Sequence, residues 1–172
     1  PVHDLGTDAE GNLFYAMKHV RGKAWDDVVG EKTLTENLEI FLKVCDAIAF
    51  AHSKDVIHRD LKPENVMLGD FGEVLVMDWG LAAAVGPKAK ADPITRETSL
   101  AGTPAYMAPE MADANAEAIG FGSDIYLLGG ILYEIVTGKR PHAGTSVMDC
   151  LVNAANNEIV PPAGTTNGWR SP

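Results

Sequence analysis

The fold of this chain is decided by the stretch His58-Arg59-Asp60-Leu61-Lys62-Pro63-Glu64-Asn65. It brings acidic, basic and amide side chains together in one short loop. Pro63 stiffens the loop, because proline fixes φ and has no backbone N–H. The same residue types also occur in ordinary turns at the end of a helix. Matching motifs further along the chain favour a functional loop over such a turn.

The pattern H-R-D-x-K-P-x-N resembles the catalytic loop of eukaryotic-type protein kinases. The resemblance implies that Asp60 accepts the proton of the attacking hydroxyl and that Lys62 places an ammonium beside the transferred phosphate. Asn65 would give a neutral oxygen to Mg²⁺, a cation that prefers oxygen ligands. His58 is expected to have a structural role in the same loop.

A second motif, Asp78-Trp79-Gly80, follows a predicted hairpin with strands at residues 66–68 and 74–77. It resembles the kinase D-F-G motif, with tryptophan in place of phenylalanine. The resemblance implies that Asp78 binds the Mg²⁺ that bridges the phosphates and that Gly80 lets the backbone swing. Trp79 would pack as an aromatic plug beneath the metal site. Met67, in the first strand of the hairpin, would form the floor under the adenine ring.

A third motif runs from Gly102-Thr103-Pro104 to Ala108-Pro109-Glu110 and resembles the kinase segment G-T-x-x-Y-x-A-P-E. In the family this segment anchors the far end of the activation loop. The resemblance implies that the Thr103 hydroxyl bonds to Asp60 and Lys62, and that Glu110 has a structural role. Its usual arginine partner belongs to a helix that we expect to be missing from this chain.

Residues 82–100 are rich in small and polar side chains and contain two proline breaks, so we expect them to be mobile. Three hydroxyls in this stretch are candidates for regulatory phosphorylation. We expect Thr98 or Ser99, and less favourably Thr95, to be an autophosphorylation site that docks on Arg59. A phosphate accepts bidentate guanidinium bonds and could order the loop in this way. In the alternative interpretation, Arg59 stabilises the loop through backbone carbonyls and the three hydroxyls are solvated.

Residues 1–20 are predicted to form two strands of a hairpin, with an apolar strand at residues 13–17. The resemblance implies that this strand leads from the small lobe into the hinge. Met17 would then lie at the back of the adenine pocket, and backbone groups of Lys18 and Val20 would bond to the adenine edge. An ordinary core hairpin is an equally good interpretation of these residues taken alone.

Four helices are predicted from the remaining pattern. A short one covers residues 24–29. A core helix of about 17 residues follows a capping box at Thr33 and Glu36, although Thr35 is an alternative cap. An apolar stripe through this helix includes Val44, Ile48 and Ala49 and ends at His52, which is predicted to pack.

The helix at residues 125–137 is apolar on nearly every side, so we expect it to lie at the centre of the lobe. Ser123-Asp124 would cap it, and residues 111–122 before it are predicted to be a loop. Asp124 also resembles the family residue that reaches back to the backbone of the catalytic loop. A further helix is expected at residues 146–156, and residues 161–172 are predicted to be disordered or an interrupted continuation.

Composition sets broad limits on the function. The 172 residues are 46% apolar and carry a net charge of −10, which disfavours binding to nucleic acid or to anionic membranes. Cys45 and Cys150 lack the spacing of a metal or redox motif, so we expect reduced thiols in the cytoplasm. No apolar run reaches the length of a transmembrane helix, and the first residues do not resemble a signal peptide. The parent protein could still be membrane-anchored outside this segment.

Together the motifs predict an α+β fold like that of protein kinases, in a fragment that lacks most of the small lobe and the last helices of the large lobe. The expected parts are the end of the small lobe (1–18), the hinge (19–22), the large lobe (23–156) and a tail (157–172). Lys62 and Thr103 resemble the corresponding residues of Ser/Thr kinases, and this resemblance implies transfer from ATP, with Mg²⁺, to Ser/Thr hydroxyls of a protein substrate. The alternatives are a pseudokinase-like scaffold module, suggested by Trp79, and a small-molecule phosphotransferase, which the third motif disfavours.

Overall fold

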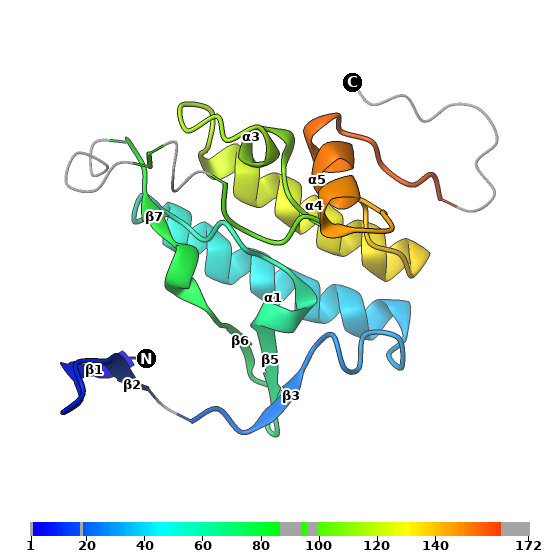
Figure 1. Cartoon of the computed structure of the whole chain (residues 1–172). Helices are drawn as coiled ribbons and strands as arrows, with labels where there is room; N and C mark the ends of the chain where they lie inside the picture. The colour runs from blue at the N-terminus through cyan, green and yellow to red at the C-terminus, as the bar shows by residue number, and fades with distance from the viewer. Residues whose placement is uncertain (1, 18, 87–93, 96–99, 163–172) are drawn as a thin grey trace.

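The structure is a computed structural model, and it describes residues 2–17, 19–86, 94–95 and 100–162. Two long helices, α1 (Leu34–His52) and α4 (Phe121–Thr137), pack against each other and form the body of the molecule (Figure 1). The shorter helices α3 (Pro109–Ala112) and α5 (Val147–Ala155) pack against each other above α4. Small antiparallel sheets complete the fold, which confirms the predicted α+β class.

Helix α1 begins where the capping box predicts. Thr33 is the cap rather than Thr35: its hydroxyl accepts a bond from Glu36 N at 3.3 Å, and the Glu36 carboxylate accepts one from Thr33 N at 2.8 Å. Val44 and Ile48 are buried as the stripe predicts, but Ala49 is exposed and Ala51 lies in the core instead. The buried side of α1 contacts α4.

A three-stranded sheet lies across α1 and contains the predicted hairpin β5 (Val66–Gly69) and β6 (Val74–Val76). Its third strand is β3 (Gly22–Ala24), which pairs with β5. The helix predicted at residues 24–29 is therefore wrong. The backbone N–H of Trp25 donates to Val66 O at 2.8 Å, and the residues after it form turns with bonds between residues three apart. The sheet and the burial of the Trp25 side chain override local helix propensity.

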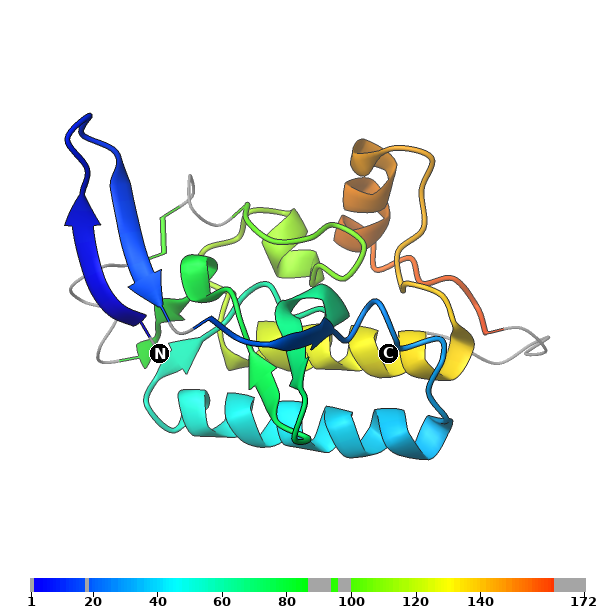
Figure 2. The ribbon, with the colours of Figure 1, turned by 90° about the horizontal axis from the view of Figure 1, so that it is seen from below.

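Two smaller strand pairs complete the topology. Strand β4 (Val56–Ile57) pairs with β7 (Ala83–Ala84), so part of the stretch predicted to be mobile is tied to the body. The predicted N-terminal hairpin is confirmed as β1 (Val2–Thr7) and β2 (Leu13–Met17). It lies to one side of the long helices in both views (Figures 1 and 2).

Helix α4 starts earlier than predicted. Its cap is Gly120, whose N–H donates to Ser123 Oγ at 3.2 Å, so Ser123 and Asp124 lie inside the first turn and are not caps. One face of α4 is in the core, whereas Ile125 and Val136 on other sides are 58% and 65% exposed. Helix α4 thus packs against α1 in the body of the molecule, as its expected central position requires, but within the described residues burial is confined to one of its faces.

The segments around α4 are partly as predicted. Helix α3 enters the region predicted as a loop at residues 111–122, whereas α5 begins after its Ser146 cap, close to the predicted residues 146–156. Of the tail predicted to be disordered, residues 163–172 lie outside the described residues.

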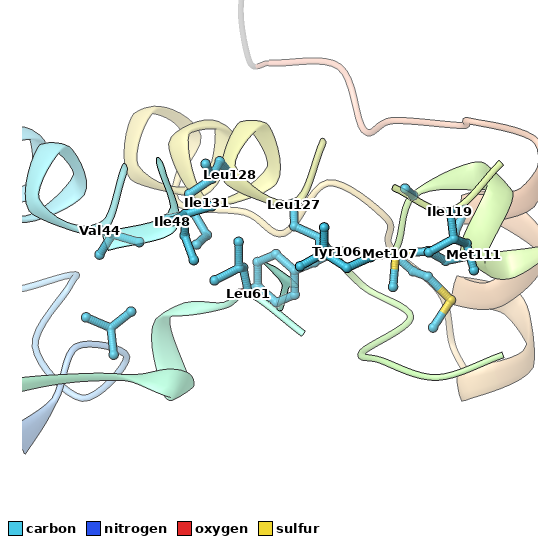
Figure 3. Packing of buried hydrophobic residues seen from close by; sticks show 14 of the residues in the cluster. Val44, Ile48, Leu61, Tyr106, Met107, Met111, Ile119, Leu127, Leu128 and Ile131 are labelled. Carbon is cyan, nitrogen blue, oxygen red and sulfur yellow. The ribbon is translucent and has the colours of Figure 1, made fainter. Parts of the chain in front are cut away.

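The hydrophobic core joins α1 and α4 to the loop that defines the sequence. Leu61, in the middle of that loop, is 1% exposed and belongs to the same buried cluster as Ile48 and Ile131 (Figure 3). Tyr106 from the third motif is fully buried in this cluster. The core therefore fixes the backbone of two motifs, and their polar side chains point away from it into a separate cluster.

Candidate active site

The Asp60 carboxylate lies at the centre of a buried polar cluster. Asp60 is 8% exposed, and its Oδ1 accepts a bond from Thr103 Oγ1 at 2.8 Å. Its Oδ2 accepts one from Asn65 Nδ2 at 3.0 Å and lies 3.2 Å from the Lys62 ammonium. A carboxylate offers about four lone-pair positions, so three donors leave room for one more. The cluster is therefore suited to receive a further hydrogen-bond donor.

Thr103 joins two motifs that are far apart in the sequence. Its hydroxyl accepts a bond from Lys62 Nζ at 2.6 Å while it donates to Asp60. The neighbouring Gly102 has φ +122°, and a Cβ there would lie 2.9 Å from Arg59 O. Only glycine can approach the loop backbone this closely in that conformation. Gly102 therefore lets Thr103 reach Asp60.

Asp124 holds the backbone of the His58–Asn65 loop from the first turn of α4. Its carboxylate is fully buried and accepts bonds from His58 N at 2.8 Å and Arg59 N at 2.9 Å. His52 Nε2 lies 2.8 Å from the same carboxylate, so His52 has a polar contact in addition to its packing. Arg59 has φ 70°, which is uncommon for a residue with a side chain. The bonds from Asp124 offset the cost of this conformation.

His58 connects the loop to the D-W-G motif. Its Nε2 lies 3.0 Å from Met77 O, and its Nδ1 accepts a bond from Asp60 N at 3.2 Å. These contacts define a neutral ring with the proton on Nε2. Burial lowers the pKa of His58, which favours the same neutral form. The ring also makes an edge contact with Trp79, with centroids 4.7 Å apart.

Asp78 is the residue after Met77, whose carbonyl contacts the His58 ring. Met77 N donates to Asn65 O at 2.7 Å, so the backbone before Asp78 is bonded to both His58 and Asn65. Asp78 itself is exposed, has φ 55°, and its Oδ1 accepts a long bond from Gly80 N at 3.4 Å. Trp79 is 39% exposed and donates from its indole to Val76 O.

The donor set fits a hard cation such as Mg²⁺. Because Asn65 Nδ2 donates to the backbone and carboxylate of Asp60, its amide oxygen is left as the possible ligand. Asp78 would add a carboxylate. Mg²⁺ commonly takes one or two protein oxygens, with phosphates and waters as its other ligands. Within the described residues no group of three or more His, Cys, Asp or Glu forms a metal site.

Glu110 has a partner within this chain. Its Oε1 accepts a bond from Ser123 Oγ at 2.6 Å, and Ser123 is fully buried in α4. The third motif is therefore tied to the same helix turn that supplies Asp124.

Several predicted site residues lie outside the described residues: Lys18, Thr98 and Ser99. Thr95 is described and exposed, and Val20 and Met67 are half-buried, with Met67 on β5 opposite Ala24 and Leu75. The backbone of Met17 ends β2 opposite Val2. Arg59 is 4% exposed, and burial lowers its pKa.

A second polar cluster, which no sequence motif marks, lies beside the loop. Its centre is Arg140, whose guanidinium donates to Glu64 Oε1 at 2.8 Å. Asp26 and Glu134 contribute two further carboxylates, and the Tyr106 ring lies beneath the guanidinium. Glu64 belongs to the His58–Asn65 motif, and this position is the one sequence feature that points to the cluster.

These elements define an α+β domain in which the first and third motifs meet at the Asp60 carboxylate, and His58 links the loop to the D-W-G motif. Residues 6–165 match the protein kinase domain family. The chain therefore belongs to the protein kinase domain family. No helix in the part of the chain that the structure describes is both long enough and apolar enough to cross a membrane.

Similar curated proteins agree with this family. The chain is 33% identical to serine/threonine-protein kinase PknD of Protochlamydia amoebophila over 94% of its length, which is 19% of that protein. It is 32% identical to serine/threonine-protein kinase PknB of Mycobacterium tuberculosis over 97% of its length, 27% of that protein. For a probable PknB of Corynebacterium glutamicum the identity is 35%, over 94% of this chain and 25% of the relative. The chain thus spans between 19% and 27% of the length of these relatives.

Proposed function

We propose that this chain is the greater part of a serine/threonine kinase catalytic domain, which transfers the γ-phosphoryl group of ATP to Ser/Thr hydroxyls of proteins. The observation that carries the proposal is the Asp60 carboxylate, held by Thr103, Lys62 and Asn65 and able to accept one more bond. Its family and the printed names of its relatives support the same activity.

In this proposal each side chain acts on a stated atom. The fourth position on Asp60 accepts the hydrogen bond of the substrate hydroxyl and then its proton, as the hydroxyl oxygen bonds to phosphorus. The bond from phosphorus to the bridging oxygen of ADP breaks in the same step. The Lys62 ammonium lies beside the carboxylate, where it can offset the negative charge on the transferred group. Asn65 and Asp78 would hold Mg²⁺, which supplies charge neutralisation when bound.

The remaining assignments follow the family order. We assign residues 1–18 to the end of the small lobe, 19–22 to the hinge, 23–156 to the large lobe and 157–172 to the tail. Met17, Lys18, Val20 and Met67 would contact adenine. We place the domain in the cytoplasm, where ATP is available and where Cys45 and Cys150, both free, stay reduced. The acidic net charge suits a protein substrate better than nucleic acid.

The test is to supply Mg²⁺ and ATP to the whole protein that carries this chain, together with a generic protein acceptor. We expect phosphoserine or phosphothreonine in the acceptor by mass spectrometry. Nucleotide binding without any transfer would indicate a scaffold module. Transfer to an aminoglycoside but to no protein would indicate a small-molecule phosphotransferase, and either result would overturn the proposal.

A further inference from the structure

The Arg140 cluster lies outside the roles assigned above, yet it contacts both the His58–Asn65 loop and the third motif. Arg140 follows the α4 stop at Gly138, and its side chain turns back toward that helix. Its NH2 donates to Glu64 Oε1 at 2.8 Å and lies 3.6 Å from Asp26 Oδ1, while its Nε lies 3.8 Å from Glu134 Oε1. One guanidinium therefore faces three carboxylates from three separate segments.

The first contact reaches the His58–Asn65 loop. Glu64 is the middle residue of a single 3-10 turn, Pro63–Asn65, which links Lys62 to Asn65. Asn65 N donates to Lys62 O at 3.0 Å, so a movement of this turn moves two of the three residues that contact the Asp60 carboxylate.

The second contact reaches the third motif. The guanidinium lies over the Tyr106 ring, 5.6 Å from its centroid, and Tyr106 is fully buried. The Tyr106 hydroxyl donates to Glu134 Oε2 at 2.6 Å, and Tyr106 N donates to Thr103 O at 3.0 Å. The ring beneath Arg140 is therefore joined by one backbone bond to the residue that donates to Asp60.

Charge explains why this arrangement needs a cation. The Glu134 side chain is 12% exposed and the Glu64 side chain 32% exposed, so the two carboxylates are only partly screened by water. Burial raises the pKa of Glu134, while Arg140 acts in the opposite direction. Without Arg140 the carboxylates would repel one another next to the loop.

We propose that Arg140 is a positioning residue for the transfer reaction: it holds the Pro63–Asn65 turn and the Thr103–Tyr106 segment in register, so that Lys62, Asn65 and Thr103 meet Asp60. This inference rests on the proposed function. Arg140 does not touch the Asp60 carboxylate or the reacting groups; it acts through Glu64 and Tyr106.

The test compares Arg140→Ala with Lys139→Ala in the whole protein. Lys139 is the exposed neighbouring cation, so its removal changes the net charge equally. With rates normalised to the number of nucleotide-binding sites, Arg140→Ala should lower kcat by about 10-fold to 100-fold. KM for ATP and for the acceptor should stay within about 2-fold, and Lys139→Ala should match wild type. If the normalised kcat of Arg140→Ala equals that of wild type, the role of Arg140 is overturned. A lower KM of this variant for basic peptides would also overturn it, because the carboxylates around Arg140 would then be a binding site for substrate.

Two further measurements keep the inference testable if Arg140→Ala fails to fold or if transfer is absent. In a double-mutant cycle of Arg140→Lys and Glu64→Gln, positioning through the pair predicts that the double variant is no slower than the slower single variant; fully additive losses contradict it. Amide hydrogen exchange at Asn65 and Tyr106 should speed up in Arg140→Lys but not in Lys139→Ala. Unchanged exchange would overturn the positioning role whether or not wild type transfers phosphate, whereas absence of wild-type transfer alone would overturn the proposed function.

Discussion

Asp60 and Asp78 belong to the same candidate site, but the fold holds them very differently. Asp60 is 8% exposed and accepts bonds from Thr103 and Asn65, with the Lys62 ammonium 3.2 Å away. Asp78 is exposed, and the bond from Gly80 N to its carboxylate is 3.4 Å long. Contacts within the loop and from the third motif therefore fix the carboxylate that would take the proton, whereas the carboxylate that would bind metal is exposed and accepts one long bond.

The largest effect on phosphoryl transfer should come from replacing Asp60. Replacement Asp60→Asn keeps the shape but removes the base, so transfer in the whole protein should fall by about 10² to 10⁴-fold. Nucleotide affinity should change little, because the contribution of Asp60 is made mainly in the transition state. Single-turnover rates and nucleotide titrations measure the two quantities. An unchanged rate would remove Asp60 from its role.

Replacing the two proposed metal ligands should instead weaken nucleotide binding. Asp78→Ala should weaken Mg²⁺-dependent nucleotide binding by at least about 10-fold. Asn65→Ala should weaken it less, because an amide oxygen carries no full charge. Titration of nucleotide with and without Mg²⁺ separates the two variants. If both variants and wild type show equal metal dependence, the assignment of these two ligands is wrong.

A smaller effect is expected from the segment between the D-W-G motif and Gly102-Thr103. We hypothesise that Thr98 or Ser99, or less favourably Thr95, is autophosphorylated and that the phosphate docks on Arg59. Replacing all three by alanine should lower activity by about 10-fold, the equivalent of one charge-assisted hydrogen bond. Phosphosite mapping of the whole protein identifies the residue, and phosphatase treatment of wild type should reproduce the loss. Full activity of the triple variant would place control elsewhere.

The smallest effect is the pH dependence of stability that comes from His58, the residue that links the loop to the D-W-G motif. Because burial lowers the pKa of His58, the unfolded chain takes up a proton at higher pH than the folded chain does. The stabilising contribution of neutral His58 is therefore complete above its ordinary pKa of about 6.5 and is lost as pH falls through the lower folded value. The melting temperature should fall more steeply with acidification in wild type than in His58→Gln. If the melting temperature falls equally steeply with pH in both proteins, the neutral, buried state of His58 is contradicted.

The sequence predicted the parts that depend on local chemistry. The motifs around Asp60 and Thr103 named residues that the structure brings together, and the capping box at Thr33 gave the start of α1. These signals are readable because each needs particular side chains at fixed spacing.

The errors arose where distant segments decide the outcome. Residues 24–29 have helix-compatible side chains, but Ala24 and Trp25 bond to β5 and the residues after them form turns. Ser123 resembles a cap, yet its hydroxyl bonds to Glu110 and accepts from Gly120. Arg140 carries no motif, because its three carboxylates come from segments far apart in the chain.

The central claim is that the fold alone orders the part of the site around Asp60, whereas the part around Asp78 is ordered by ligand. The most direct test is amide hydrogen exchange of the whole protein with and without Mg²⁺ and a non-hydrolysable nucleotide. The amides of His58, Arg59 and Asp60 each donate to a buried side chain, so they should be protected before ligand is added and change little afterwards. The amides of Asp78 to Gly80 should exchange rapidly at first and gain protection when ligand binds. If the amides at 58–60 are unprotected until nucleotide is added, the ligand and not the fold assembles the Asp60 half, and the account is contradicted.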